Sequence, residues 1–132
     1  MGNDRIYKSR IVATGNFDCT LQMFEQITML TFSGYISYAD FAAVRELYKT
    51  IRNIYDICVI DISRVVDFDE ALYSMLLSAV AVSRLNGAEF ILIANGNSAK
   101  RLKCSGLAKL FSIVSSMASL HAKFAREREA SL

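Results

Sequence analysis

Residues 57–87 read ICVIDISRVVDFDEALYSMLLSAVAVSRLNG, in which two apolar runs flank a short polar interval. The first run, residues 57–62, is rich in β-branched residues, which is typical of a strand buried on both faces. Asp69 is a favourable helix N-cap, and the second run ends at the Asn-Gly pair 86–87, a common helix exit. The sequence therefore predicts a buried strand that leads through a loop at residues 63–68 into a long helix.

The loop between this strand and this helix is the expected functional region. Open α/β sheets place their functional groups at the carboxyl ends of strands, so we expect the function to lie around residues 67–74. Asp67, Asp69 and Glu70 form an acidic trio there. Carboxylates are favoured at a helix start by its exposed amide groups and dipole, and oxygen ligands also suit magnesium or calcium. Helix capping is the preferred interpretation, and no metal site is expected.

The rest of the chain predicts a small α/β domain. Residues 1–16 are a loose end or an extra strand, and the elements that follow are a strand hairpin at 17–24 and 27–34, helices at 38–52, 98–103 and 116–129, and a strand at 89–94. Two strand–helix–strand units require parallel pairing and right-handed crossovers. We expect a single domain over residues 1–132, with its core at about 17–128. Its mixed sheet joins an antiparallel hairpin to parallel strands, and four helices pack on it.

Composition and cysteine usage exclude several classes of protein. The chain of 132 residues is 53% hydrophobic with a net charge of +2, which is too small to indicate nucleic-acid binding. The first ten residues are polar, and no segment has the roughly 18 apolar residues of a membrane helix, so neither a signal peptide nor a transmembrane span is expected. Cys19, Cys58 and Cys104 are far apart, which favours reduced thiols in a cytoplasmic protein.

The usual signatures of enzymes and cofactor sites do not occur in the sequence. It has no glycine-rich dinucleotide or phosphate loop and no Gly-x-Ser-x-Gly, so we expect neither catalysis nor a cofactor. His121, the sole histidine, lies on the apolar side of the last predicted helix and is interpreted as a packing or surface residue. Cys104 is interpreted as a small buried residue rather than a reactive thiol.

Four stretches together resemble the STAS domain, the fold of bacterial anti-sigma factor antagonists. They are LTFSGYIS at residues 30–37, VIDISRV at 59–65, DFDEAL at 67–72 and SAKRLKCSGL at 98–107. The family has at these places a strand end with Gly-Glu-Leu-Asp, a Val-Leu-Asp-Leu-Ser strand, a Phe-x-Asp-Ser-Ser-Gly helix start and an Arg-Leu-Leu-x-x-Ser-Gly-Leu stretch. The last is one residue shorter here. Their order and spacing over about residues 25–120 carry the resemblance.

The resemblance implies a non-catalytic protein–protein interaction module in bacterial signal transduction and transcription regulation. In that family a partner serine kinase, which is also an anti-sigma factor, phosphorylates the first serine after the aspartate. The unmodified domain binds the partner and the phosphorylated one releases it. A phosphate adds about −1.5 to −2 charges and strong acceptors at a helix N-terminus within the interface.

This sequence departs from the family at that serine. Glu70 stands in its place and Ala71 at the next serine, so neither position can accept a phosphoryl group. Glu70 either mimics the phosphorylated state or contacts a basic residue of the partner. Ser63 and Ser74 are alternative phosphoacceptors, although a helix-surface role is preferred for Ser74. The predicted partner-binding surface consists of Tyr35, Ser37, Asp69, Glu70, Tyr73 and Ser74.

Two other functions stay open at this point. The first is a STAS accessory subunit of a transporter or lipid-trafficking complex, or a STAS domain that binds a small molecule, with which the high apolar content is compatible. The second is an enzyme that uses the acidic trio with a divalent ion. A homodimer is a further possibility, with a hydrophobic contact supplied by Leu107, Phe111, Met117 and Phe124.

Overall fold

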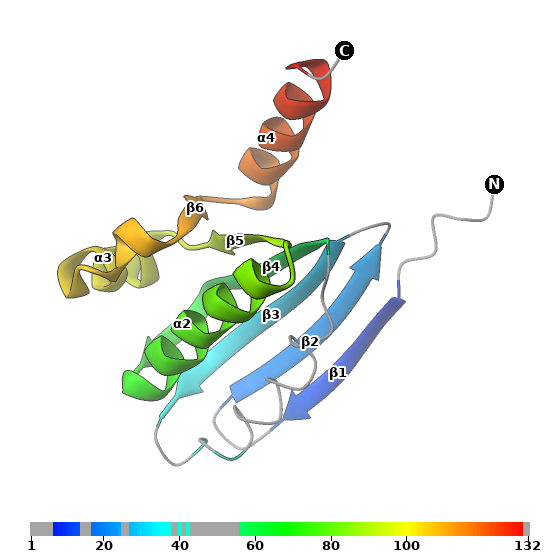
Figure 1. The fold of residues 1–132 in the computed structure, drawn as a ribbon. Coiled ribbons are helices and arrows are strands. Elements are labelled where there is room, and N and C mark those ends of the chain that lie inside the picture. Colours follow the sequence, from blue (N-terminus) through cyan, green and yellow to red (C-terminus); the bar gives the residue numbers. More distant parts are fainter. Residues whose placement is uncertain are drawn as a thin grey trace.

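The protein is seen here as a computed structural model, which describes residues 7–13, 17–24, 27–37, 40, 42 and 56–130. Its elements are β1 (Tyr7–Ala13), β2 (Phe17–Phe24), β3 (Ile27–Ile36), β4 (Ile57–Phe68), α2 (Glu70–Leu85), β5 (Glu89–Ile93), α3 (Gly96–Ser105), the 3₁₀ turn η2 (Leu107–Leu110), β6 (Ser112–Val114) and α4 (Met117–Ala130). They form one sheet in the order β1-β2-β3-β4-β5-β6 (Figure 1). The predicted helix at 38–52 lies outside the described residues, apart from positions 40 and 42.

The predicted mixed α/β sheet is confirmed. β2 and β3 form an antiparallel hairpin whose last pair is Phe24 with Ile27, and β1 adds to it antiparallel as the extra strand. From β3 onward each strand pairs in parallel with the next. β6 is an additional edge strand that the predicted element order did not contain. It pairs with β5 through residues 112–114.

The predicted loop at residues 63–68 is wrong, because β4 continues through it to Phe68. The pairing of β4 with β3 shifts twice, between the pairs at Thr31 and Ser33 and again between those at Gly34 and Tyr35. Each shift places an extra residue on β4, and such bulges disturb the period-two burial pattern. The apolar alternation therefore breaks after Ile62 although the strand does not, and β3 likewise extends past Gly34.

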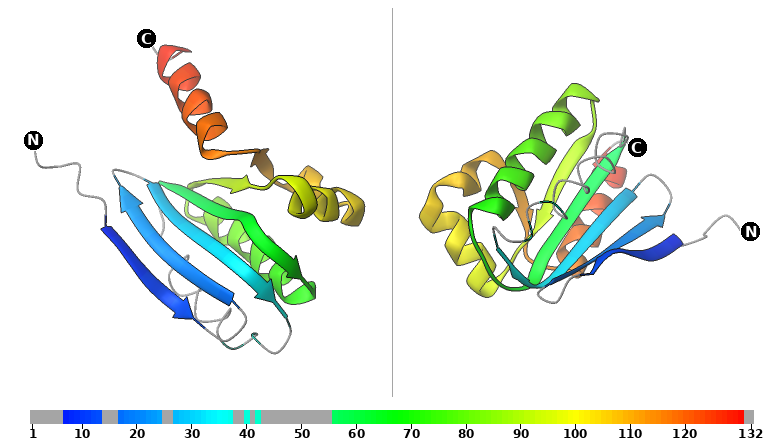
Figure 2. Two further views of the ribbon diagram at one scale, coloured as in Figure 1. Left: turned by 180° about the vertical axis from the view of Figure 1, so that it is seen from behind. Right: turned by 90° about the horizontal axis from the view of Figure 1, so that it is seen from below.

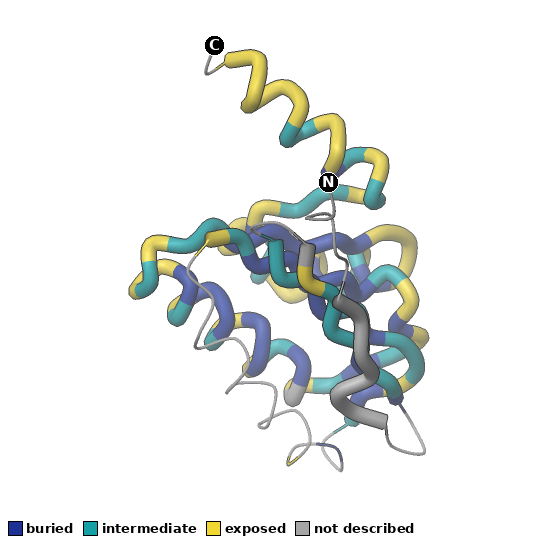
Figure 3. The backbone as a smooth tube through the Cα atoms, turned by 90° about the vertical axis from the view of Figure 1, so that its right-hand side faces the viewer, coloured by how far each residue is buried: buried dark blue, intermediate teal, exposed yellow. Residues whose placement is uncertain are grey.

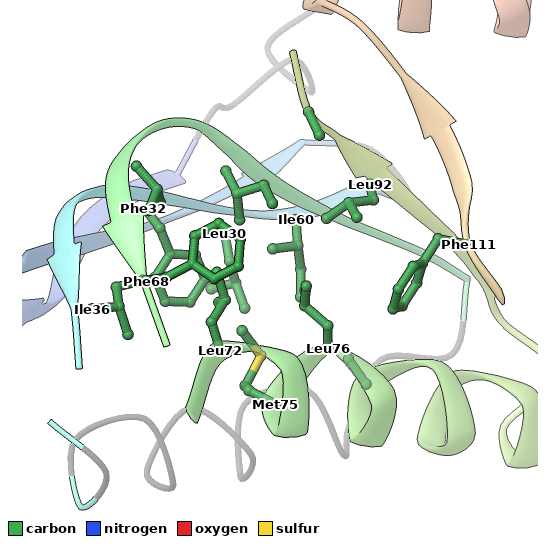
Figure 4. Packing of buried hydrophobic residues seen from close by; sticks show 14 of the residues in the cluster. Leu30, Phe32, Ile36, Ile60, Phe68, Leu72, Met75, Leu76, Leu92 and Phe111 are labelled. Carbon is green, nitrogen blue, oxygen red and sulfur yellow. The ribbon is translucent and has the colours of Figure 1, made fainter. Parts of the chain in front are cut away.

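The core lies on both faces of the sheet. On one face Leu30, Ile60 and Leu92 pack against Leu72 and Leu76 of α2 (Figure 4). The opposite face has a smaller cluster, which consists of Met29, Val59, Ile91, Ile93 and Leu120 of α4. The first half of β4 and most of β5 are thus covered on both sides, which explains the apolar runs at residues 57–60 and 90–93.

α2 ends as the sequence predicts. Gly87 has a φ of 71°, which places it in the left-handed region. Its N–H donates to the carbonyl oxygen of Arg84 at 3.2 Å, and the Ala88 N–H donates to that of Ser83 at 2.8 Å. This pair of bonds is the Schellman arrangement, which satisfies carbonyl groups at the end of the helix.

The expectation of four helices packed on the sheet needs correction. The described residues contain α2, α3, α4 and one 3₁₀ turn, and α4 packs only through its first turns. Its remaining turns are mostly exposed and extend away from the sheet (Figures 1 and 3), since residues 125–130 offer no large apolar side chain. α3 begins at Gly96 and not at Ser98. No described helix is long and apolar enough to cross a membrane.

The four residues proposed for a dimer contact pack against the hydrophobic clusters of their own chain. Phe111 is buried against Phe90, with ring centroids 6.0 Å apart, and Leu107 packs on the same cluster. Met117 and Phe124 pack against the cluster on the opposite face. These intramolecular contacts account for part of the apolar surface of the four residues. Cys104 is exposed, contrary to the prediction that it is buried.

Candidate functional site

The carboxyl ends of β3 and β4 meet the start of α2. Tyr35 pairs with Asp67 and Ile36 with Phe68 in the parallel ladder. The backbone N–H of Asp69 donates to the carbonyl oxygen of Ile36 at 3.1 Å. The last pairs of β3 with β4 therefore lie beside the start of α2. Figure 2 shows the arrowheads of β3 and β4 and the first turn of α2 at the same end of the sheet.

Glu70 is the first residue of α2 and its side chain is exposed. Ser74 lies one turn further along the helix and is also exposed, whereas Asp69 and Tyr73 are half-buried. Because residues i and i+4 share a helix face, Glu70 and Ser74 are neighbours on the surface of α2. Four of the six predicted residues thus lie at the start of this helix.

Tyr35 and Ser37 also lie at the carboxyl end of β3, but their side chains have different surroundings. Ile36 points into the core beneath α2, so Tyr35, which precedes it on the strand, points to the opposite face of the sheet. Its side chain is 44% exposed. Ser37 donates its backbone N–H (3.1 Å) and its hydroxyl (3.3 Å) to the buried carboxylate of Asp40. The structure therefore does not bring Tyr35 onto the face of Glu70, and the Ser37 hydroxyl is already occupied.

A cluster centred on Arg101 supports the site, and the sequence interpretation missed it. The guanidinium carbon of Arg101 lies 4.4 Å from the centroid of the Phe68 ring, and the same group pairs with the carboxylate of Asp67. Tyr73 packs edge-on against Phe68 at 5.2 Å and donates its hydroxyl to the backbone oxygen of Arg101 at 3.3 Å. These contacts tie α3 to the end of β4 and to the start of α2.

The residues of this cluster border a shallow depression of about 440 Å³ between α2 and α3, which is lined by Tyr73, Asn97, Lys100, Arg101, Cys104 and Ser105. Asn97 donates its side-chain amide to the backbone oxygen of Val66 at 3.3 Å, which anchors the start of α3. α3 carries three basic residues and no acidic one. The surface is therefore acidic at the start of α2 and basic along α3.

One carboxylate of the acidic trio already has a partner within the chain. Asp67 is committed to Arg101, and the structured part of the chain contains no group of three histidine, cysteine or acidic side chains that could hold an ion. Ser63, one of the alternative phosphoacceptors, donates its hydroxyl to the Asp61 carboxylate at 2.6 Å and is half-buried. Ser74, the other alternative phosphoacceptor, is exposed.

The three cysteines differ in environment. Burial raises the pKa of Cys58 to about 12, and burial together with the neighbouring charge of Asp18 does the same for Cys19. Cys104 is exposed beside the depression. A thiol-reactive probe should therefore distinguish the site cysteine from the other two.

Comparison with known proteins identifies the fold. No protein-family model matches the sequence, and no curated protein matches it. Solved structures do. An anti-sigma factor antagonist from Mycobacterium paratuberculosis is 18% identical with a TM-score of 0.71, over 83% of this chain and 96% of that one. The anti-sigma factor antagonist SpoIIAA in its unphosphorylated form is 11% identical with a TM-score of 0.62, over 82% and 97%. The chain therefore has the STAS fold of these antagonists, as its sequence motifs predicted.

Proposed function

We propose that this protein is a non-catalytic regulatory module of the anti-sigma factor antagonist type, which acts in the cytoplasm by binding a protein partner. The partner class that this proposal favours is a serine kinase that is also an anti-sigma factor. The STAS fold supports the general assignment, and the character of the site supports the detailed one. The site offers a helix start, an aromatic side chain and opposite charges.

The observation that carries the proposal is the position of Glu70. It is the first residue of α2 and it is exposed. Its equivalence to the phosphorylated serine of the family motif is part of the proposal. A carboxylate at a helix N-terminus is stabilised by the exposed amides and the dipole. It therefore supplies a permanent charge where a phosphoserine would supply about −1.5 to −2 charges reversibly.

The proposed binding surface is centred on Asp69, Glu70, Tyr73 and Ser74, with Tyr35 and Ser37 at its border. The Tyr73 ring is held by Phe68 and its hydroxyl by α3, so it presents a rigid face at low entropic cost. Rigid aromatic residues and charges at the rim are typical of interaction surfaces.

The test compares purified variants against a purified partner. The partner is first co-purified from the native host with the full chain as bait, and its dissociation constant is then measured by calorimetry for wild type, Glu70→Gln and Glu70→Ser. Glu129→Gln, which changes an exposed glutamate on α4, is the matched control. We expect at least a fivefold change for both Glu70 variants and none for the control.

The sign of the change distinguishes the two roles of Glu70. Tighter binding of Glu70→Gln indicates that Glu70 mimics the released, phosphorylated state. Weaker binding indicates that Glu70 contacts a basic residue of the partner. Equal affinities for all four proteins would refute the proposed role of this residue.

A further inference from the structure

Tyr73 belongs to two adjoining surfaces. It is part of the proposed binding surface at the start of α2, and it also lines the depression between α2 and α3. Its side chain is half-buried, and it is held in place by the ring of Phe68 and by the backbone oxygen of Arg101 on α3. Glu70 precedes Tyr73 by three residues, so the two lie on neighbouring parts of the α2 surface. A partner that covers the Tyr73 ring therefore also reaches the rim of the depression.

The depression has a positive charge that is not neutralised within the described part of the chain. Two cations line it, and one of them, Arg101, pairs with Asp67. The other, Lys100, is exposed and makes no ion pair with any described residue. Lys103 is exposed one turn further along α3, which contains no acidic residue. One positive charge therefore remains in the lining after the pair with Asp67 is subtracted, and Lys103 adds another beside it.

Lys100 limits what can bind over the depression. An exposed ion pair contributes little in water, so a free small anion gains little from this lysine. A protein surface that covers Tyr73 also removes water from Lys100, and a desolvated cation without a counter-charge is unfavourable. A carboxylate on the covering surface compensates this cost and adds specificity. The charge therefore favours an acidic side chain of the covering protein.

We propose that the partner that binds at the start of α2 places an aspartate or a glutamate in the depression, where its carboxylate meets Lys100. The binding surface then extends from Glu70 across Tyr73 to Lys100, with opposite charges at its two ends. This inference rests on the proposed function, because the same partner protein occupies both regions. It adds the chemistry of a second contact, on α3.

A second copy of the chain carries both of these charges as well. A two-fold pairing would set Glu70 of each copy against Lys100 of the other. Such a pairing would cover Glu70, whose accessibility the proposed function requires. The inference therefore assigns the depression to the partner, and sedimentation of the chain alone distinguishes the two occupants.

The first measurement locates the partner on the chain. The partner that co-purifies with the full chain is treated with a water-soluble carbodiimide, which joins an amine to a carboxylate in direct contact. We expect a link between Lys100 and an aspartate or glutamate of the partner, which mass spectrometry identifies. Cys104 is a second reporter, because it lies one turn from Lys100 on α3 and also lines the depression. Its labelling by a thiol reagent should slow at least tenfold in the complex.

The second measurement tests the charge. Lys100→Glu should weaken the partner at least fivefold. Lys109→Glu makes the same charge change at an exposed lysine outside the depression, and it should bind as the wild type does. Replacement of the linked partner residue by lysine should restore the binding of Lys100→Glu. Urea unfolding of both chain variants checks that they are folded.

Three results would overturn the proposal: an unchanged labelling rate of Cys104 in the complex, no partner carboxylate linked to Lys100, or equal affinities for Lys100→Glu and Lys109→Glu. Dimerisation of the chain alone that Lys100→Glu weakens would assign the depression to a second copy instead.

These outcomes are separate from the proposed role of Glu70. Equal affinities for wild type and the Glu70 variants refute that role, while the protection of Cys104 and the link to Lys100 still report on the depression. An unprotected Cys104 refutes the contact in the depression, while the comparison at Glu70 still stands. Recovery of no protein with the full chain would contradict both proposals.

Discussion

Replacement of Arg101 by alanine should destabilise the protein, because its side chain ties α3 to the end of β4. Its guanidinium stacks on Phe68 at the end of β4 and pairs with Asp67, while its backbone oxygen accepts the Tyr73 hydroxyl of α2. Alanine removes the first two interactions and keeps the third. Lysine keeps the charge but loses the flat stacking surface, so it should be intermediate.

The magnitude follows from the exposure of the pair. The side chains of Arg101 and Asp67 are 33% and 50% exposed, so the ion pair contributes only about 0.2–1 kcal/mol. The stacking on Phe68 contributes about 0.5–1 kcal/mol at a site of this kind. We therefore expect a loss of about 1–1.5 kcal/mol for Arg101→Ala. At an m-value of about 1.5 kcal/mol/M this lowers the urea midpoint by roughly 0.7–1 M.

Urea unfolding followed by circular dichroism measures this difference. Lys100→Ala is the matched control, since it removes the neighbouring, exposed cation of α3 and should change stability by less than about 0.5 kcal/mol. In 1 M salt the deficit of Arg101→Ala should shrink by a few tenths of a kcal/mol as the ion pair is screened. Equal midpoints for Arg101→Ala and Lys100→Ala would show that the cluster does not hold α3 in place.

Four further predictions concern three single residues and the two buried cysteines. Gly87→Ala should cost about 1 kcal/mol in urea unfolding, because φ is 71° and the added Cβ meets no atom within 4 Å, so strain alone acts. Ser83→Ala should raise stability by about 1 kcal/mol, since this buried hydroxyl has no hydrogen-bond partner among the described residues; an unchanged or lower midpoint contradicts this. A thiol reagent at pH 8 should label Cys104 alone until denaturant is added. Cys19 and Cys58 ionise near pH 9 when unfolded but near 12 when folded, so unfolding releases protons and stability should fall from about pH 9 upward.

The sequence predicts the central part of the fold because burial there follows simple rules. The β4 run from Ile57 to Ile62 is apolar except for Asp61, since both of its faces are covered, and α2 starts directly after Asp69 and ends before the left-handed Gly87. The hairpin of β2 and β3 has clear strand patterns on both sides of a two-residue link. In each of these cases the local signal and the tertiary environment agree.

The sequence fails where tertiary contacts override the local pattern. Two bulges continue β4 through Arg64 and Val66, whose exposed side chains look like loop residues. β6 is only three residues long, so its pattern is too short to recognise. The Arg101 cluster joins residues 34 positions apart, and no periodicity reports such a contact. Tyr35 lies on the face opposite to α2 because strand alternation decides its direction.

The position of Glu70 is the basis of the proposed function, and a single affinity comparison tests it. The dissociation constant of the purified partner is measured for wild type and for Glu70→Gln, which removes the charge at nearly constant size. A change of fivefold or more, with Glu129→Gln unchanged, is the result that a built-in charge at the start of α2 predicts. Identical affinities for the two proteins would contradict it.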